Sequence, residues 1–330
     1  MGVNMSKSRS SRPIFKARSA GAAVGLTKRQ LLRLVASFAA GVAFQRSAIA
    51  GVPRSGPTGS PHIIDTDWTY FNTYSQQTPT AIPFWASTSP WNVGALTRVS
   101  SPDQVTPAGN SFFTRIRLFP NNFPNHTTVE WAFPEKAAPS HVYCFDRIVM
   151  GKTSDHAYTD TVPYCQIQNL ATLTATHDAT YASEAGGAHH NIIYDFFTYS
   201  TVPGDYNNFQ NEFSISLHCQ DYEAAAVADL PASNKFEFTD SQGTAWICYT
   251  HATPAIGAKG NQIVFVKADY SDCLVYTVDI KAMLQACVSR GWALGTDYFA
   301  GIAIGAEPAQ GTGQWTLNSW SLSYNGTTYP

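Results

Sequence analysis

The sequence predicts an all-β fold: a β-jelly roll or sandwich of two curved antiparallel sheets with one packed helix. Only 13% of the residues are charged and 13% are aromatic, while 23 glycines and 19 prolines are spread along the chain. Short runs in which apolar and polar residues alternate recur between these turn residues, which is typical of half-buried strands in a sandwich. One segment has helical periodicity instead.

Eight alternating runs are the clearest predicted strands. They are residues 112–119, 142–149, 191–198, 212–217, 245–250, 263–267, 299–306 and 316–324. The helical segment is 278–291 (VDIKAMLQACVSRG), with Gly291 as its C-terminal stop. No internal repeat and no change of composition divides residues 63–330, so we expect them to form a single domain with one large core.

The first 50 residues are predicted to be an export signal. They hold nine Lys or Arg residues and no acidic residue, and they end in a short apolar stretch and an A-x-A cleavage site at Ala48 and Ala50. The segment 27–33 (TKRQLLR) resembles a twin-arginine motif with Lys28 in place of the first arginine. We therefore expect cleavage after Ala50, a secreted or periplasmic protein, and a flexible lead-in at residues 51–62.

The chain that follows the signal is acidic. It keeps 12 basic and 23 acidic side chains, a formal net charge of −11. Such a surface argues against binding to nucleic acid or anionic lipid and is compatible with a neutral polysaccharide as the partner. No later stretch is long and apolar enough to cross a membrane. We expect a monomer without a cofactor.

Six cysteines lie in this exported part of the chain, namely Cys144, Cys165, Cys219, Cys248, Cys273 and Cys287. An even number suggests disulfides, although six cysteines allow 15 connectivities. Cys219 and Cys248 each end a predicted strand and are the preferred pair, with buried free thiols as the alternative. No cysteine or histidine spacing predicts a metal site.

One predicted strand carries a carboxylate on a polar face. In residues 211–218 (NEFSISLH), neighbouring side chains point to opposite faces of the sheet. Glu212 therefore shares a face with Ser214 and Ser216, and the apolar residues between them point to the other face.

A second predicted strand carries a carboxylate on a face of small residues. In residues 301–308 (GIAIGAEP), Glu307 shares its face with Ala303 and Gly305, which leaves room for a large ligand to lie across the sheet. Two carboxylates that converge on one bond are the machinery of glycoside hydrolysis, so Glu212 and Glu307 are candidate catalytic residues. Solvated glutamates on half-exposed strands are the alternative.

Several segments resemble glycoside hydrolase family 12, the compact jelly-roll endoglucanases and xyloglucanases. Residues 192–198 (IIYDFFT) resemble the family's YDLFT strand, and residues 211–217 (NEFSISL) resemble its nucleophile strand. Residues 243–249 (GTAWICY) and 305–311 (GAEPAQG) are similar to its GxxWxxY and GTEPFTG strands, and Trp320 follows as a closing aromatic. The blocks keep the family's order over roughly residues 190–325.

This resemblance implies a retaining mechanism with three acidic residues. Glu212 would be the nucleophile, Glu307 the general acid and base, and Asp195 a supporting aspartate that hydrogen-bonds the nucleophile. Retention requires the two glutamate carboxylates to lie about 5–5.5 Å apart. The pKa of Glu307 should then be raised by its apolar strand and by the charge on Glu212.

The substrate contacts differ from the family pattern. Ser214 and Ser216 replace a Met and a Trp that touch the sugar, so we expect Ser216 to line a wider and more polar cleft. Trp91, within residues 89–94 (SPWNVG), is a candidate sugar platform that only partly matches the family's NNLWG segment. Trp131, within residues 130–133 (EWAF), is either a second platform or a core residue.

The sequence thus predicts an enzyme, an exported retaining endo-β-glucanase that cleaves internal β-1,4-glucosidic bonds of a cellulose-like, mixed-linkage or xyloglucan chain. A jelly-roll polysaccharide lyase for an acidic glycan is an alternative, because residues 298–301 (YFAG) are similar to a strand of those enzymes. The predicted active strands lack the arginine that would neutralise a uronate. A non-catalytic carbohydrate-binding protein of the same fold is the other alternative.

Overall fold

The computed structural model describes residues 56–66, 70–72, 84–135, 142–153, 162–183, 189–204, 208–219, 222–252 and 260–329. The predicted export signal lies outside the described residues, as does the first part of the predicted lead-in. Residues 57–330 form one compact unit. The last residue of the predicted lead-in, His62, is already the first residue of strand β1.

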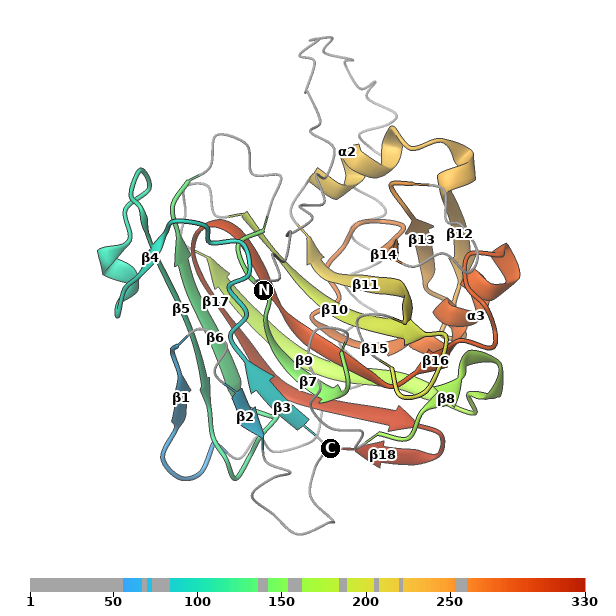
Figure 1. Cartoon of the computed structure of the whole chain (residues 1–330), viewed down its shortest axis with the longest axis horizontal. Coiled ribbons are helices and arrows are strands. Elements are labelled where there is room, and N and C mark those ends of the chain that lie inside the picture. Colours follow the sequence, from blue (N-terminus) through green and yellow to red (C-terminus); the bar gives the residue numbers. More distant parts are fainter. Residues whose placement is uncertain are drawn as a thin grey trace, which may run out of the picture. The chain divides into compact units, whose positions relative to one another are not determined.

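The described part of this unit is built from two sheets, as the alternating patterns predict (Figure 1). The first, sheet B, carries the strands with the candidate carboxylates. Its order is β2 (Tyr70–Asn72), β3 (Phe84–Ser87), β7 (Asp146–Gly151), the first part of β17 (Gly301–Tyr324), β10 (His189–Tyr199), β11 (Phe209–Cys219), β14 (Asn261–Lys267), β13 (Ala245–Tyr249) and β12 (Lys235–Thr239). At one end of β10, β16 (Tyr298–Phe299) pairs with it and with β8 (Cys165–Gln166).

The second sheet, sheet A, takes up the other half of β17. Its order is β1 (His62–Ile64), β5 (Ser111–Leu118), β6 (Thr127–Phe133), the second part of β17, β9 (Leu173–Ser183) and β15 (Val275–Asp279). The short strand β18 (Thr327–Tyr329) folds back on the end of β17, and β4 (Thr97–Arg98) pairs with the start of β5. All pairings are antiparallel except β4 with β5 and β11 with β14.

Strand β17 joins the two sheets. Its residues 301–306 pair with β7 in sheet B, and its residues 311–317 pair with β6 in sheet A. Glu307 therefore lies at the point where the strand leaves one sheet for the other. We call this crossing of β17 from sheet B to sheet A the joint of β17.

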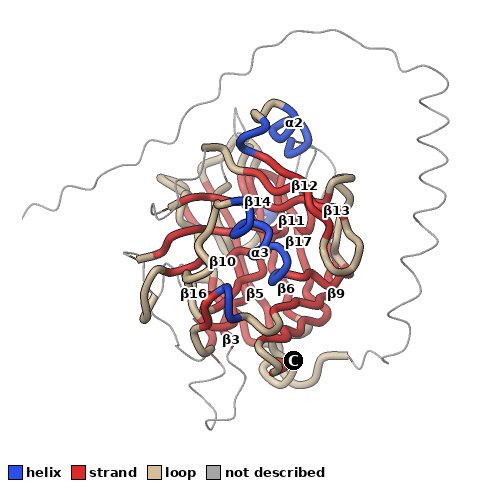
Figure 2. The backbone as a smooth tube through the Cα atoms, turned by 90° about the vertical axis from the view of Figure 1, so that its right-hand side faces the viewer, coloured by secondary structure: helices blue, strands red, loops and turns tan. Residues whose placement is uncertain are grey.

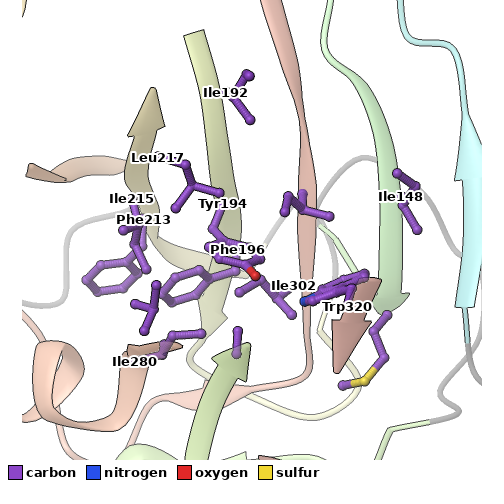
Figure 3. Packing of buried hydrophobic residues seen from close by; sticks show 14 of the residues in the cluster. Ile148, Ile192, Tyr194, Phe196, Phe213, Ile215, Leu217, Ile280, Ile302 and Trp320 are labelled. Carbon is purple, nitrogen blue, oxygen red and sulfur yellow. The ribbon is translucent and has the colours of Figure 1, made fainter. Parts of the chain in front are cut away.

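The main hydrophobic core lies between the sheets and follows the predicted alternation. Figure 3 shows Phe213 and Ile215 of β11 beside Tyr194 and Phe196 of β10, with Trp320 of β17 packed beyond them. All five side chains are at most 1% exposed. Burial of one face of each strand fixes which face is left for a ligand.

Helix α3 (Ile280–Arg290) is the predicted helix, and Figure 2 shows how little helix accompanies the strands. Its N-cap is Asp279, whose carboxylate accepts a hydrogen bond from the backbone N–H of Ala282 at 3.0 Å. Gly291 ends the helix with φ 77°, a left-handed conformation that favours glycine, so the predicted stop is confirmed.

Several elements were not predicted. Helix α2 (Tyr222–Ala228) follows β11, and Val227 of this helix packs over the outer face of sheet B, against Ile247 and Val264. Three short 3-10 turns, η2 (Pro102–Gln104), η3 (Ile167–Asn169) and η4 (Ala232–Asn234), lie in loops. Strand β7 begins at Asp146, four residues later than predicted, because Tyr143 and Phe145 before it donate their backbone N–H groups to Pro308 of β17 and to Ser89 in a loop.

The cysteines correct one prediction. Cys248 is a free, buried thiol, so the predicted Cys219–Cys248 disulfide is not formed; the side chain of Cys219 lies outside the described part of the chain. The sulfur that Cys248 contacts belongs to Cys287 of α3, at an Sγ–Sγ distance of 3.7 Å. The strand end predicted the wrong partner because α3 packs against β13 from a distant part of the sequence.

Candidate active site

Glu212 lies near the start of β11, on the face of sheet B that points away from the core. It is opposite Phe197 of β10 and Gln262 of β14, and it is partly buried. Ser214 and Ser216 follow on the same face, as predicted, but they are only 8% and 4% exposed. Ser216 therefore lies on the predicted face without forming an open floor.

The residue before Glu212 anchors this end of β11. Asn211 is buried, and its amide donates hydrogen bonds to Thr198 Oγ1 at 3.2 Å and to Asp297 Oδ2 at 3.4 Å. Burial raises the pKa of Asp297 to about 6. This network fixes the strand at the position from which Glu212 projects.

Asp195 lies on β10, the strand between the two glutamates. It faces Ser214 across β11 and Ala303 across β17, and its side chain is 6% exposed. Asp195 and Glu212 are diagonal neighbours on one face, and such positions are about 7–8 Å apart at their backbones, within reach of long side chains. A buried carboxylate is stable only when it is paired or hydrogen-bonded, so the low exposure of Asp195 favours a specific role over that of a solvated acid.

Glu307 is opposite Asn191 at the end of the sheet-B part of β17, and it is partly buried. The three predicted catalytic residues therefore share one face of sheet B and come from three adjacent strands. This placement follows from the alternation in each strand, while the adjacency of the strands follows from the topology.

The register sets Glu212 and Glu307 on a diagonal of this face. Their partners on β10, Phe197 and Asn191, are six residues apart, which is about 20 Å along a straight strand. In a flat sheet with this register, the carboxylates of Glu212 and Glu307 would therefore lie much farther apart than the 5–5.5 Å of a retaining enzyme. A separation of 5–5.5 Å requires sheet B to twist and curl so that the two side chains approach each other.

The small residues beside Glu307 do not leave open space, which corrects the prediction of a bare face. A Cβ at Gly305 would come within 2.8 Å of the Phe145 ring, so this ring lies over the glycine. Ala303 is fully buried in a cluster with Trp85 and Phe145, completed by Val149 and Ile193. Any ligand must lie beside this apolar cluster rather than directly on Gly305 and Ala303.

Arg147 is a residue of this face that the sequence analysis missed. It lies on β7 directly opposite Gly305 and is 3% exposed. Its guanidinium packs over the rings of Trp85 at 5.7 Å and Phe145 at 5.6 Å. The strand 142–149 was predicted, but only the order of strands reveals that β7 borders the sheet-B part of β17.

Trp91 lies in the loop between β3 and β4 and is 46% exposed. Its neighbour Asn92 donates its backbone N–H to the carbonyl of Tyr143 at 3.0 Å, and Tyr143 donates its own N–H to the carbonyl of Pro308 at 2.8 Å. These bonds tie the loop of Trp91 to the residue that follows Glu307. An exposed indole held in this way can stack on a sugar.

Trp131 was predicted to be either a sugar platform or a core residue, and the structure places it in the core. It is fully buried between the sheets and packs against the His190 ring with a centroid distance of 5.0 Å. It is therefore a core residue and does not present an open platform to a ligand.

The described residues offer no group of three or more His, Cys, Asp or Glu side chains arranged to hold a metal ion. None of the helices described is long and apolar enough to cross a membrane.

Fold and site together define a β-jelly roll with acidic residues across the outer face of one sheet. Solved structures with a similar fold include family 12 glycoside hydrolases. The native family 12 xyloglucanase from Bacillus licheniformis has a TM-score of 0.59 at 16% identity, over 80% of this chain and 100% of that chain. Endoglucanase 3 from family GH12 of Trichoderma harzianum has a TM-score of 0.58 at 16% identity, over 82% of this chain and 100% of that chain.

A metagenome-derived family 12 endoglucanase gives a TM-score of 0.53 at 13% identity, over 81% of this chain and 100% of that chain. No protein-family model and no curated protein matches the sequence. The structural likeness therefore establishes the fold, which is that of the family 12 glycoside hydrolases.

Proposed function

We propose that this protein is a retaining endo-β-glucanase that cleaves internal β-1,4-glucosidic bonds of a glucan. The observation that carries the proposal is that Glu212, Asp195 and Glu307 share the outer face of sheet B on three adjacent strands. The same three residues carry the resemblance to family 12, whose fold this chain has.

In this proposal Glu212 attacks the anomeric carbon and forms a glycosyl-enzyme. Glu307 protonates the leaving glycosidic oxygen in the first step and then takes a proton from water in the second. Asp195, as the diagonal neighbour of Glu212, orients the nucleophile. Trp91 stacks on a sugar ring of the bound glucan.

The proposed substrate is a neutral cellulose-like, mixed-linkage or xyloglucan chain. The acidic surface of the exported chain disfavours an acidic polymer by like-charge repulsion. Export through the N-terminal signal, with cleavage after Ala50, would bring the enzyme to such extracellular substrates. N-terminal sequencing of the exported protein tests this part, and a start other than Gly51 contradicts the cleavage site.

Arg147 favours one alternative, a lyase for an acidic glycan. The outer face of sheet B does carry an arginine. It lies on β7 rather than on the strands of the glutamates, and an arginine can neutralise a uronate. Its low exposure and its packing between two aromatic rings favour a structural role instead.

Incubation with a panel of neutral and acidic polysaccharides separates these functions, with Glu212→Gln as the matched control. We expect new reducing ends from glucans and none from the control. Ultraviolet absorbance from unsaturated sugars would instead identify a lyase, and binding without cleavage would identify a carbohydrate-binding protein.

A further inference from the structure

Four rings from both sheets meet beside the joint of β17. They are Trp131 of β6, Tyr181 of β9, His190 of β10 and His218 of β11. The ring centroids of His190 and His218 are 4.9 Å apart, and Tyr181 lies 5.4 Å from the first and 4.1 Å from the second. Trp131 closes the cluster against His190. This histidine cluster ties the end of sheet B to sheet A.

The position of the histidine cluster connects it to Glu307. His190 is opposite Pro308, and the next residue, Asn191, is opposite Glu307. The pairing of β10 with β17 has an irregularity at His190, where the register shifts. On the other side of the joint, Trp131 is opposite Gly313. The rings thus hold β17 both before and after it changes sheets.

The surroundings of His190 favour a neutral imidazole on this residue. His190 is 1% exposed, and neither of its ring nitrogens has a hydrogen-bond partner within the described residues. His218 donates from Nδ1 to Asp272 Oδ1 at 2.9 Å, while its Nε2 is buried without a partner in the same part of the chain. A charge on His190 would be desolvated and would face another imidazole.

We propose that His190 is a positioning residue for Glu307. Its stacking with His218 makes the joint of β17 sensitive to acid. The neutral His190 ring, packed against Trp131, Tyr181 and His218, holds the crossing of β17, and protonation of His190 at low pH loosens it. The role of Glu307 in this inference rests on the proposed function, whereas the acid-sensitive joint does not.

The groups around His190 agree with this behaviour. Burial, helped by the neighbouring His218 and His189 and opposed by Asp272, lowers the pKa of His190 to about 4. The other sides are formed by Tyr181, by the uncharged Trp131 and by Pro308 of β17. Protonation therefore sets in only as the pH approaches 4, and it then breaks the packing on which the joint depends.

The test is hydrogen–deuterium exchange of the peptide covering residues 301–311, in wild type and in His190→Phe, which keeps a ring but cannot titrate. His189→Phe, one residue away and outside the cluster, is the matched control. At pH 7 we expect equal exchange in all three proteins. At pH 4 we expect wild type and His189→Phe to exchange roughly threefold faster than His190→Phe.

Equal exchange of wild type and His190→Phe at pH 4 would overturn the inference. If His190→Phe does not fold, an NMR titration of the histidine rings in wild type decides instead. A His190 signal that titrates near 4 and shifts the Glu307 amide at the same pH supports the joint. Titration near 6.5, or without an effect on Glu307, refutes it.

The link to catalysis is measured separately, from the pH dependence of glucan hydrolysis, with the rate of each protein expressed relative to its own rate at pH 7. Compared with wild type, the acid limb of the pH–rate profile of His190→Phe should lie lower by about half a pH unit or more. A protein without glucanase activity that still shows the exchange difference would contradict the proposed function and leave the joint intact.

Discussion

At the scale of single residues, Asp146 shows how burial decides protonation. It is fully buried, and its Oδ1 accepts the backbone N–H of Ser89 at 2.9 Å. Burial raises the pKa of Asp146 to about 7, which the hydrogen bond from Ser89 and the charge of Arg98 only partly oppose. Below about pH 7 the folded protein therefore favours the protonated form of Asp146.

Asp146→Asn should remove a loss of folding stability that grows as the pH rises. Because the pKa is raised on folding, the contribution of Asp146 to stability is full below about pH 4 and is lost as the pH rises to about 7. Asparagine keeps the acceptor for Ser89 and carries no charge. We expect it to stabilise the protein at pH 8 by at most about 4 kcal/mol, with a smaller gain at pH 5. Urea unfolding at both pH values measures this, and an equal effect at both would contradict it.

Glu212→Gln should abolish glucan hydrolysis and leave the fold intact, because an amide cannot attack the anomeric carbon. We expect a loss of more than about 10³-fold in kcat and an unchanged Tm. Glu237→Gln, at an exposed glutamate on β12, is the matched control. Hydrolysis within tenfold of wild type would exclude Glu212 as the nucleophile.

Glu307→Ala should distinguish the acid and base roles. Cleavage of the polysaccharide should fall by roughly 10²–10⁴-fold, because its leaving group needs protonation, while activated aryl glycosides should still form the glycosyl-enzyme. Azide should then restore turnover of the aryl substrate and give a β-glycosyl azide. An α-configured first product from wild type, seen by NMR, would rule out retention and both assigned roles.

At the scale of elements, β17 depends on close approach to its neighbour β7. A Cβ at Gly305 would collide with the carbonyl oxygen of Asp146 and press on the Phe145 ring. Glycine therefore allows Phe145 to cover this strand and complete the apolar cluster beside Glu307.

Gly305→Ala should destabilise the protein by roughly 1–3 kcal/mol or more, since the clash is with backbone that cannot rotate away. The control is Gly56→Ala, where a Cβ meets no atom within 4 Å. Thermal unfolding of both variants measures the difference. Equal Tm values would show that β7 and β17 are farther apart than described.

At the scale of the whole molecule, residues 57–330 form one compact unit, and the residues of the main core all lie in it. Removal of the predicted signal should therefore leave folding intact. We expect a chain that starts at Gly51 to unfold at the same temperature as the full chain, within about 2 °C. A drop of more than about 5 °C would show that the first 50 residues stabilise the folded unit.

Much of this molecule could be predicted from local patterns. Alternation identified β10, β11, β14 and both halves of β17, and it put Glu212 and Glu307 on the faces of their strands that point away from the apolar residues, while Asp195 came from the family resemblance. The helical period and Gly291 gave α3. These features depend on backbone geometry within a few residues, where side chains alternate in a strand and recur every 3.6 residues in a helix.

Only the tertiary structure decided which strands are neighbours and what fills the space between them. The sequence could not reveal that Phe145 lies over Gly305 and Arg147 of β7 pairs with it, that Trp131 belongs to the core, or that Cys248 faces Cys287. Each of these contacts joins parts of the chain that are far apart in sequence. Their formation depends on strand pairing and packing across the whole chain, and no local pattern of residues encodes it.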